Sequence, residues 1–472
     1  MSLGGFSPLE MLGLVQHELL LFAAVFFVIG AVDEFAVDLC WIWLKLTGRV
    51  RTTRLPADFA ENTQLMGVCA VFIPAWQEHG VIGTTVSHAL AVWAQPELRL
   101  YVGCYRNDTQ TIAAVIKAGG GDTRLRIVIH DKAGPTTKAD CLNRLYRALC
   151  DDEARSGERA HMVVMHDAED MVDPVGLPLL DRATRVADLV QLPVLPIPQG
   201  RSRWIGSHYC EEFAEAHAKG MVVRDAIGAA IPSAGVGCAM ARSILDRLAA
   251  DGAGDMPFAA ECLTEDYELG LRIAELGGTT RFIRVRSADG RLIATRACFP
   301  HQLGAAVRQK TRWVLGIAFQ GWDRLGWKGG VADFWMRVRD RRGPFTAIVL
   351  ASAYLLLVLS TVGWAANLAG MGQPIAISPL LEMLLIINFA SFAWRAAARF
   401  SFAANEYGLV EGLRAVFRIP ITNIIAIMAG RRALVAYFLS LRGAVQVWDK
   451  TTHDAHPALE YLDKPVLAEA SA

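Results

Sequence analysis

Residues 345–394 most limit how this chain can fold, because Glu382 is the only charged side chain among them. A helix that crosses a bilayer needs about 20 apolar residues, so this stretch is long enough for two such helices. Glycine and proline at positions 370–374 favour a turn between them. The segment therefore predicts a transmembrane hairpin with helices at residues 345–368 and about 377–394.

A second apolar run lies near the N-terminus, at residues 19–32, and contains no charged side chain. It reaches the length of a membrane span only if the helix extends backward or forward along the chain. The forward extension includes Asp33, Glu34 and Asp38, whose spacing can place them on one face of a helix. We expect a first span or a deep interfacial helix here, with a buried core helix as the alternative.

Residues 419–430 are also apolar, but this run is short and is followed by Arg431 and Arg432. Two arginines in the middle of a spanning helix carry a high free-energy cost. We therefore predict that residues 411–447 form helices lying in the cytosolic interface. The alternative is a fourth span, which would place the C-terminal tail outside.

Basic residues gather on one side of the predicted spans, whereas residues 1–18 contain no Lys or Arg. Because Lys and Arg favour the cytoplasmic side, we expect the N-terminus outside and residues from about 45 to 342 in the cytoplasm. The flanking basic residues are Lys45, Arg49, Arg51 and Arg54 after the first span, Arg337, Arg339, Arg341 and Arg342 before the hairpin, and Arg395 and Arg399 after it.

The net charge and the cysteine content argue against a nucleic-acid binder, a disulfide-bonded fold and a zinc site. The 47 Lys and Arg balance 47 Asp and Glu, which argues against a nucleic-acid binder that relies on net positive charge. Nine dispersed cysteines without a C-x-x-C pair indicate reduced thiols rather than a disulfide framework or a zinc site.

Short apolar runs alternate with helical stretches between residues 65 and 342. The runs at 66–73, 98–104, 125–129 and 161–165 are each bounded by turn or polar residues. This alternation predicts an α/β domain with a mostly parallel sheet. Ligands of such sheets bind at the carboxyl ends of the strands, so functional residues are expected directly after these four runs.

Three carboxylates follow the fourth run, in the sequence His166-Asp167-Ala168-Glu169-Asp170. Such a cluster is strained by mutual repulsion unless a cation is bound, and carboxylate oxygens suit Mg²⁺ or Mn²⁺. We expect a metal site here, with a solvated acidic loop as the alternative.

Three further groups stand out, and each has a purely structural alternative. Residues 264–268 (TEDYE) are an acidic cluster, or a simple helix N-cap. In residues 309–313 (QKTRW), an Arg–Trp pair can bind phosphate and stack a sugar, or anchor the chain at the membrane surface. Residues 448–453 (WDKTTH) are a candidate gating element, or another interfacial anchor.

The order of these groups resembles the membrane-embedded family 2 glycosyltransferases with a GT-A fold, which include cellulose, chitin and hyaluronan synthases. Asp167-Ala168-Glu169 matches the D-x-D position, Thr264-Glu265-Asp266 the T-E-D position, and Gln309-x-x-Arg312-Trp313 the Q-x-x-R-W position. Over about residues 15–457 the chain resembles the phage N4 adsorption protein B family in particular. That likeness rests on residues 102–108, 137–143, 166–170, 211–215, 232–237 and 448–453.

The resemblance implies a role for each matching residue. Asp266 would be the general base, with Glu265 beside it. A Mg²⁺ or Mn²⁺ ion would be held by Asp167 and by Glu169 or Asp170. The nucleotide-sugar donor would contact Pro74, Ala75, Gln77, Glu78, Asn107, Asp108, Lys138, Asp167 and Arg312. The acceptor would contact Gly235, Gly237, Cys238, Gln309 and Trp313, and Trp448, Lys450, Thr451 and His453 would form a gate.

The expected function is that of an inverting glycosyltransferase, a hexosyl- or N-acetylhexosaminyl-transferase. It would move a sugar from a UDP-linked donor to a growing glycan at the bacterial inner membrane, coupled to export through an outer-membrane partner. The alternatives are non-processive transfer to a lipid carrier and a catalytically silent scaffold or phage-adsorption component. The expected regions are 1–54 (first helix and linker), 55–342 (cytosolic GT-A domain), 343–395 (hairpin) and 396–472 (interfacial helices and tail).

Overall fold

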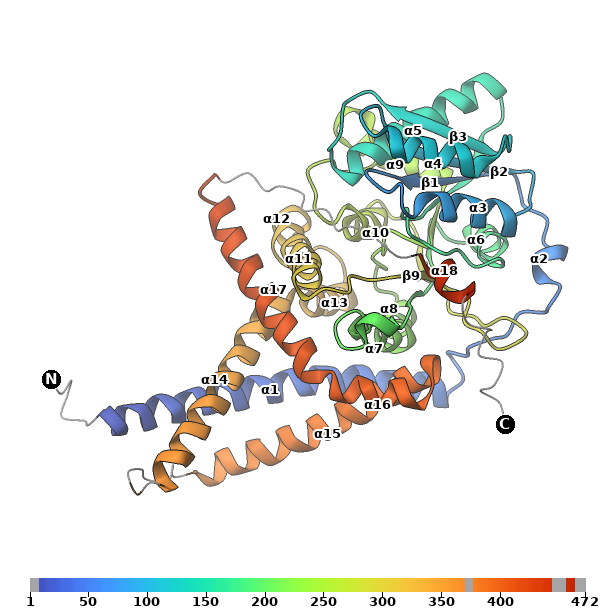
Figure 1. Cartoon of the computed structure of the whole chain (residues 1–472). Helices are drawn as coiled ribbons and strands as arrows, with labels where there is room; N and C mark the ends of the chain where they lie inside the picture. Colours follow the sequence, from blue (N-terminus) through green and yellow to red (C-terminus); the bar gives the residue numbers. More distant parts are fainter. Residues whose placement is uncertain (1–7, 369, 371–376, 444–455, 463–472) are drawn as a thin grey trace.

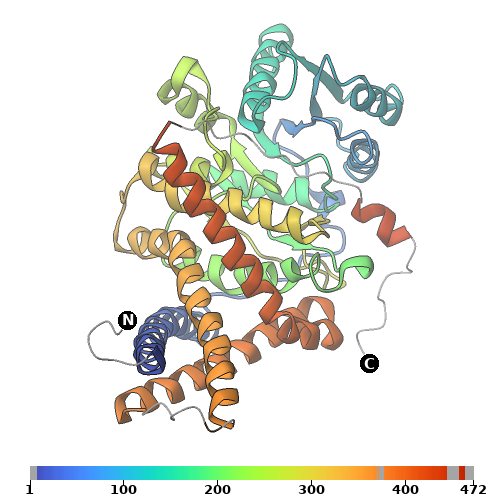
Figure 2. The same cartoon turned by 60° about the vertical axis from the view of Figure 1, so that its left-hand side comes forward.

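In the computed structural model, the protein consists of an α/β domain and a set of long apolar helices that extend away from it (Figures 1 and 2). The structure describes residues 8–368, 370, 377–443 and 456–462. Trp448, Lys450, Thr451 and His453, the predicted gating residues, lie outside the described residues.

The main sheet has the strand order β3-β2-β1-β4-β7-β5-β8. Its strands run parallel except for β7, which pairs antiparallel with both of its neighbours. The strands are β1 (Val68–Pro74), β2 (Leu98–Tyr105), β3 (Leu125–His130), β4 (Ala160–Met165), β5 (Leu189–Gln191), β7 (Cys238–Ala241) and β8 (Thr280–Phe282), and β6 (Val194–Pro196) pairs separately with β9 (Thr295–Ala297). The predicted α/β fold and its first four strands are thus confirmed.

Helices cover both faces of this sheet, which explains why β1 and β4 read as continuous apolar runs. One face packs against α3 (Ile82–Val92), α4 (Thr109–Gly119) and α6 (Gly176–Thr184). The other packs against α5 (Lys138–Ser156), α9 (Arg242–Asp251) and α10 (Glu265–Glu275). Short elements at the periphery are α2 (Phe59–Asn62), η1 (Gly200–Ser202), η3 (Ala253–Asp255) and α18 (Pro457–Leu462).

A third layer of helices lies between the sheet and the apolar helices. Two of its members contain π-helical turns, η2 after α7 and η4 after α11. The layer consists of α7 (His208–Glu215), η2 (Ala216–Gly220), α8 (Met221–Ala226), α11 (Leu303–Val314), η4 (Leu315–Gln320), α12 (Gly321–Leu325) and α13 (Val331–Arg341). It contacts both α1 (Pro8–Leu46) and α15 (Pro379–Tyr407), so it connects the α/β domain to the apolar helices.

Within the described residues, four helices are long and apolar enough to cross a membrane. Helices α14 (Gly343–Leu368) and α15 occupy the predicted hairpin, and α1 extends the N-terminal run in both directions. The fourth is α17 (Ile419–Ser440), which follows the short α16 (Leu409–Phe417). Helix α17 continues through Arg431 and Arg432, so its length and composition fit the alternative of a fourth span. The interfacial position predicted for residues 411–447 stays a prediction.

Helix α17 packs along α11 of the third layer and against the first turns of α14. Gly430 allows the second contact, because a Cβ there would lie 2.4 Å from the Cβ of Ala347. Near the other end, the Tyr437 hydroxyl donates to the carboxylate of Asp323 at 3.1 Å. Helix α17 thus lies between the third layer and the apolar helix α14, and Arg431 and Arg432 are exposed on its surface.

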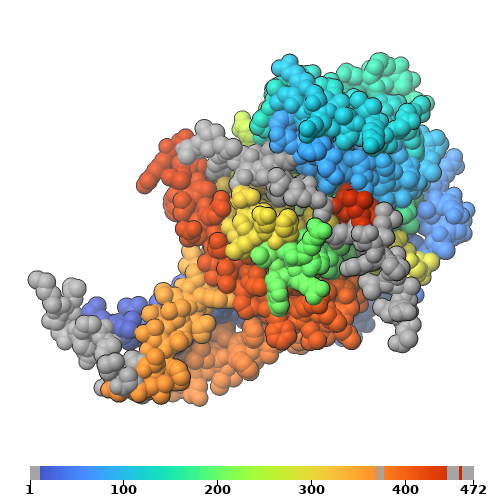
Figure 3. Space-filling view, viewed as in Figure 1, coloured from blue at the N-terminus to red at the C-terminus, as the bar shows by residue number. Residues whose placement is uncertain are grey.

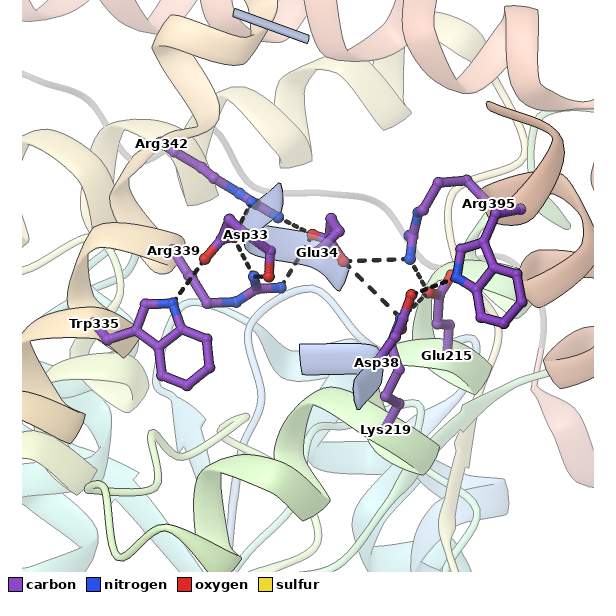
Figure 4. Close-up of polar contacts among 10 residues, drawn as sticks. Asp33, Glu34, Asp38, Glu215, Lys219, Trp335, Arg339, Arg342 and Arg395 are labelled. Carbon is purple, nitrogen blue, oxygen red and sulfur yellow. Dashed lines mark hydrogen bonds and ion pairs between the residues drawn. The ribbon is translucent and has the colours of Figure 1, made fainter. Parts of the chain in front are cut away.

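Asp33, Glu34 and Asp38 do share one face of α1, and they lie in an ion-pair network at the third layer (Figure 4). Asp33 pairs with Arg339 and Arg342, and Glu34 pairs with the same two arginines and with Arg395 of α15. Asp38 pairs with Lys219 of η2, which also binds Glu215 at 2.6 Å. The Trp335 and Trp394 indoles donate to Asp33 and Asp38, each at 2.7 Å. Acidic residues in an apolar helix are thereby compensated by cations from the rest of the protein.

Candidate active site

A cavity of about 560 Å³ opens at the carboxyl ends of β1, β2 and β4, where strand topology predicted the functional residues. Residues from all the motifs near these strand ends meet there, although they are up to about 240 positions apart in the sequence. Of the predicted site residues, those that line it are Pro74, Ala75, Glu78, Lys138, Asp167, Glu169, Asp170, Glu265, Asp266, Gln309, Arg312 and Trp313.

Lys138 is held at the start of α5, because Thr137 caps this helix by accepting a hydrogen bond from the Asp140 backbone N–H at 3.1 Å. Its Nζ atom lies 2.6 Å from Oδ1 of Asp167, and its side chain is 16% exposed. The negative charges of Asp167, Glu265 and Asp266 raise the pKa of Lys138 in spite of its burial. Lys138 therefore stays cationic and can interact with a diphosphate.

Glu265 and Asp266 occupy the first turn of α10, where acidic residues complement the helix dipole. Burial raises the pKa of Asp266, although Lys138 opposes this shift. Burial and the charge of Asp266 together raise the pKa of Glu265 to about 7. The capping alternative explains only the position of the pair, whereas the raised pKa values show that the two carboxylates share a crowded, partly buried site.

Gly235 brings backbone into direct contact with these charged groups. A Cβ at this position would lie 2.7 Å from Oδ2 of Asp266 and 3.1 Å from Nζ of Lys138, and its φ is +74°. Gly237 also has a positive φ, and a Cβ there would meet Oγ1 of Thr295 at 2.2 Å. Cys238 follows as the first residue of β7 and is buried. These residues therefore form a close-fitting backbone wall beside Asp266.

Asp167, Glu169 and Asp170 of the acidic loop after β4 all line the cavity. Asp170 is 1% exposed, and its Oδ2 accepts a hydrogen bond from the Asp167 backbone N–H at 2.9 Å and contacts Nδ1 of His166 at 3.0 Å. One oxygen of Asp170 thus shapes the loop, and the place of Asp170 among the metal ligands stays a prediction, whereas Asp167 and Glu169 are the other two expected ligands.

Within the described residues, no cluster of three or more His, Cys, Asp or Glu side chains is arranged to hold a metal ion. Two carboxylates nevertheless fit a magnesium or manganese ion bound with a nucleotide, because substrate phosphates and waters supply its other ligands in such sites. The chemistry of Asp167 and Glu169 is therefore compatible with the expected cation.

Gln77, Asn107 and Asp108 were predicted to contact the donor, but they support neighbouring loops instead of lining the cavity. Oδ2 of Asp108 accepts a hydrogen bond from the Gln77 backbone N–H at 2.5 Å, and Oδ1 of Asp108 caps α4. The Asn107 amide makes two reciprocal hydrogen bonds of 2.8 Å with the backbone of Gly134. All three residues hold the rim of the cavity in place.

Aromatic residues that the sequence reasoning missed form two of the cavity walls. On the β1–β2 side, Trp76 packs edge-on against Tyr105 at 5.1 Å between ring centroids. On the α11 side, Trp313 lies within 6.5 Å of Phe213 and Phe299. Phe213 and Phe299 are 86 positions apart and each stands singly in its segment, so periodicity alone gave no signal for this wall.

Helix α18 appears as a red patch between the blue segment that includes α3 and the green segment of α7 and α8 (Figure 3). His456, just before this helix, is 1% exposed, and burial lowers the pKa of its imidazole to about 4. The C-terminal segment thus contributes a neutral, buried side chain behind the loop that carries Asp167 and Glu169.

A family model described as "Glycosyltransferase like family 2" matches residues 67–316, which is more than half of the chain. The chain belongs to this family. The matched region contains the cavity, Lys138, the acidic loop, the acids of α10 and the Q-x-x-R-W helix. Most of the cavity lining therefore lies within the region that identifies the family.

The chain is also 31% identical over 456 residues to bacteriophage adsorption protein B of Escherichia coli K12, and equally to bacteriophage N4 adsorption protein B of E. coli O157:H7. These alignments cover 91% of this chain and 61% of each relative, so the chain spans about three fifths of their length.

A mannosyltransferase of Pyrobaculum calidifontis, solved with GDP-mannose and Mn²⁺, has a similar structure. The TM-score is 0.50 at 16% identity, and the match covers 86% of this chain and 99% of that one. The family and this neighbour together confirm the predicted GT-A fold.

Proposed function

We propose that this protein is an inverting glycosyltransferase that transfers a sugar from a nucleotide-sugar donor to a membrane-associated acceptor. The observation that supports this best is the convergence of Lys138, Asp266 and Arg312 on one cavity. Lys138 faces the proposed position of the diphosphate, and Asp266 is available as a base. Arg312 supplies a second cation from the membrane-proximal helix α11.

Asp266 acts as the general base in this proposal. The acceptor hydroxyl gives its proton to Asp266 while its oxygen bonds to the anomeric carbon, and the nucleoside diphosphate leaves from the opposite face. A raised pKa makes Asp266 a stronger proton acceptor than an ordinary aspartate. A single displacement of this kind inverts the anomeric centre, so an α-linked donor gives a β-linked product.

Lys138 and Arg312 stabilise the leaving diphosphate, whose negative charge increases as the glycosidic bond breaks. Asp167 and Glu169 hold a Mg²⁺ or Mn²⁺ ion that neutralises further diphosphate charge when it is bound. The P. calidifontis neighbour, solved with Mn²⁺ and GDP-mannose, supports a divalent cation of this type.

The donor is proposed to be a UDP-linked hexose or N-acetylhexosamine, bound along the carboxyl ends of β1 and β2. The edge-on pair of Trp76 and Tyr105 offers aromatic surface for the base. Pro74, Ala75 and Glu78 line the same side of the cavity. Gln77, Asn107 and Asp108 support the donor site indirectly, by holding its rim.

The acceptor is proposed to be a growing glycan, and the product to be exported across a bacterial inner membrane. Trp313 and its aromatic neighbours supply a surface on which sugar rings can stack. The helix that carries Trp313 also packs against α17. The proposed orientation places the N-terminus outside and the α/β domain in the cytosol, with an outer-membrane partner receiving the product.

Incubation of membranes containing the full chain with a panel of labelled nucleotide sugars tests this proposal. UDP-glucose, UDP-N-acetylglucosamine, UDP-galactose and GDP-mannose are supplied in turn, and the product is analysed by mass spectrometry. We expect one UDP-linked donor to give a β-linked glycan. A single sugar on a lipid would identify the acceptor as a lipid carrier, and release of no nucleotide from any donor would contradict enzymatic function.

The matched variants are Asp266→Asn and Asp251→Asn. Replacing the base should reduce the rate of product formation by a factor of about 10² to 10⁴, while donor binding is retained. Asp251 lies at the end of α9, is 56% exposed and pairs with Arg272 at 3.1 Å, so its variant should behave as wild type. Full activity of Asp266→Asn would exclude Asp266 as the base.

A further inference from the structure

A second cavity, of about 550 Å³, lies between α1, α15 and η2, on the opposite side of the third layer from the candidate active site. It begins at the end of the ion-pair network where Asp38 binds Lys219 (Figure 4). Its other lining residues include Trp41, Lys45 and Thr52 from the N-terminal segment, Arg284 and Arg286 from the loop after β8, and Trp394, Phe402 and Asn405 from α15.

This cavity has an excess of positive charge. Asp38 and Lys219 at one end compensate one another. At the other end, Glu406 is the carboxylate that pairs with both Arg284, at 2.7 Å, and Arg286, at 2.6 Å. Lys45 faces the same space. Among the described side chains, Lys45, Arg284 and Arg286 are therefore accompanied by one carboxylate, Glu406, which gives a net charge of +2.

Arg284 has one buried guanidinium donor, Nε, that lacks a hydrogen-bond acceptor among the described residues. Its side chain is 10% exposed. One terminal nitrogen binds Glu406 and the other donates to Thr52 at 3.2 Å, but its Nε has no hydrogen-bond partner among the described residues. A buried, unsatisfied guanidinium donor costs about 1–3 kcal/mol. Burial and the neighbouring Arg286 also lower the pKa of Arg284, which an anion in the cavity would reverse.

The position of the cavity favours an anion that belongs to a lipid. Lys45 lies in the last turn of α1, and Asn405 lies near the end of α15, so both mark the boundary at which these apolar helices leave the predicted membrane. Trp41, Trp394 and Phe402 supply an apolar wall next to the cations. Aromatic rings and basic side chains at this depth are typical of contacts with lipid head groups.

We propose that this cavity binds the phosphate group of a membrane phospholipid. The phosphate oxygens accept hydrogen bonds from Nε of Arg284 and from Lys45, and the glycerol and first acyl carbons pack against Trp41 and Phe402. The bound lipid thereby joins α1, α15 and the loop after β8, three segments that are far apart in the sequence.

Photo-crosslinking in nanodiscs tests the proposal with the full chain. The protein is reconstituted with a trace of diazirine-labelled phosphatidylglycerol, irradiated, and digested for peptide mapping. We expect labelling of peptides containing residues 38–52, 284–286 and 394–405. Unlabelled phosphatidylglycerol should compete, whereas diacylglycerol, which lacks phosphate, should not. Complete displacement by 10 mM inorganic phosphate would overturn the lipid assignment.

Lys45→Gln and Arg49→Gln form a matched pair for this experiment. Lys45 faces the cavity, where its Nζ lies 3.5 Å from Oγ1 of Thr52 and 5.8 Å from the centroid of the Trp41 ring. Neither contact involves a carboxylate, so the variant leaves no carboxylate of these contacts without a partner. Arg49 lies at the same membrane boundary but stacks on Trp43 outside the cavity. We expect about tenfold weaker labelling for Lys45→Gln, equivalent to one charge-assisted hydrogen bond, and wild-type labelling for Arg49→Gln. Equal labelling of the two variants would overturn the site.

Arg284→Lys supplies an independent arm, because it keeps the charge and the pairing with Glu406 within reach but removes Nε. Its labelling should also fall while its unfolding temperature stays close to that of wild type. Unchanged labelling in a folded Arg284→Lys protein would contradict the role assigned to Nε.

Discussion

Two clusters of acidic residues in this protein have similar composition but different surroundings. In the network at α1, four carboxylates (Asp33, Glu34, Asp38 and Glu215) meet four cations (Lys219, Arg339, Arg342 and Arg395) among the described side chains. In the candidate active site, eight carboxylates line the cavity, among them Asp167, Glu169, Glu265 and Asp266, together with three cations (Lys138, Arg224 and Arg312).

The difference in charge balance separates structural from catalytic acids. The carboxylates of the first cluster are neutralised by cations of the protein itself, and their ion pairs connect separate elements of the fold. The second faces a cavity with an excess of negative charge, which can accept a cation and a substrate. Burial at this cavity raises the pKa values of Glu265 and Asp266. The following predictions test this contrast, from the largest expected effect to the smallest.

Removal of divalent cations should abolish glycosyl transfer but leave the α1 network intact. A metal ion supplies several kcal/mol of charge stabilisation, so we expect a loss of roughly a hundredfold or more after treatment with EDTA. Excess Mg²⁺ or Mn²⁺ should restore activity, and the unfolding temperature should change little. Equal turnover with and without EDTA would contradict the role of Asp167 and Glu169.

Gly235→Ala should lower turnover by about ten- to a hundredfold, because the added Cβ would displace the Asp266 carboxylate and the Lys138 ammonium group. Gly228→Ala is the matched control. Gly228 has the same φ of +74°, but nothing lies within 4 Å of its added Cβ, so that variant should show only the backbone strain of about 1 kcal/mol. Steady-state kinetics and thermal unfolding distinguish the two, and equal turnover of both variants would exclude the steric argument.

Glu34→Gln should destabilise the protein by about 3 kcal/mol, since it leaves three arginines with one partner fewer in a largely buried network. Activity per folded molecule should be retained. Glu18→Gln on the same helix is the control, because Glu18 is 66% exposed and pairs only weakly with His17. Thermal unfolding in detergent measures both, and an unchanged midpoint for Glu34→Gln would show that the network carries no net stability.

The pH dependence of stability should reveal Glu265. Its pKa is raised from 4.5 to about 7 in the folded protein, so the native state binds a proton that the unfolded state has lost over this range. Its contribution is therefore fully present below pH 4.5 and is lost as the pH rises through about 7. Because the proton is shared with Asp266, we expect an effect on the order of 1 kcal/mol.

Comparison of wild type with Glu265→Gln between pH 5 and pH 8 isolates this contribution. The wild-type unfolding temperature should fall relative to that of the variant as the pH rises. A difference that is independent of pH would show that Glu265 is ionised throughout.

Local composition predicted a large part of this protein. Continuous apolar runs predicted the first four strands, because strands covered by helices on both faces contain few polar residues. The stretch with one charged residue predicted α14 and α15 by its length, and the shorter apolar run at 19–32 predicted the central part of α1. The order of the acidic and Q-x-x-R-W motifs indicated the family, since the residues of one site keep their order along the chain.

Side-chain hydrogen bonds that depend on the folded geometry of the loops decided the rest. Asp170 follows Glu169 directly, yet its carboxylate binds His166 and the backbone of Asp167. Asp108 caps α4 although it lies at a strand end that predicted contact with the donor. No local pattern distinguishes these outcomes, because each depends on which polar groups the fold brings within hydrogen-bond distance.

What the sequence determined by itself, therefore, is the type and order of the elements and the kinds of residues in the site. Only the tertiary structure decided which acids are compensated and which are exposed to a cavity. It also decided that α17 continues through its two arginines and that Lys45, Arg284 and Arg286 meet. The physical reason is that periodicity and hydropathy act over a few residues, whereas charge compensation and burial depend on contacts across the whole chain.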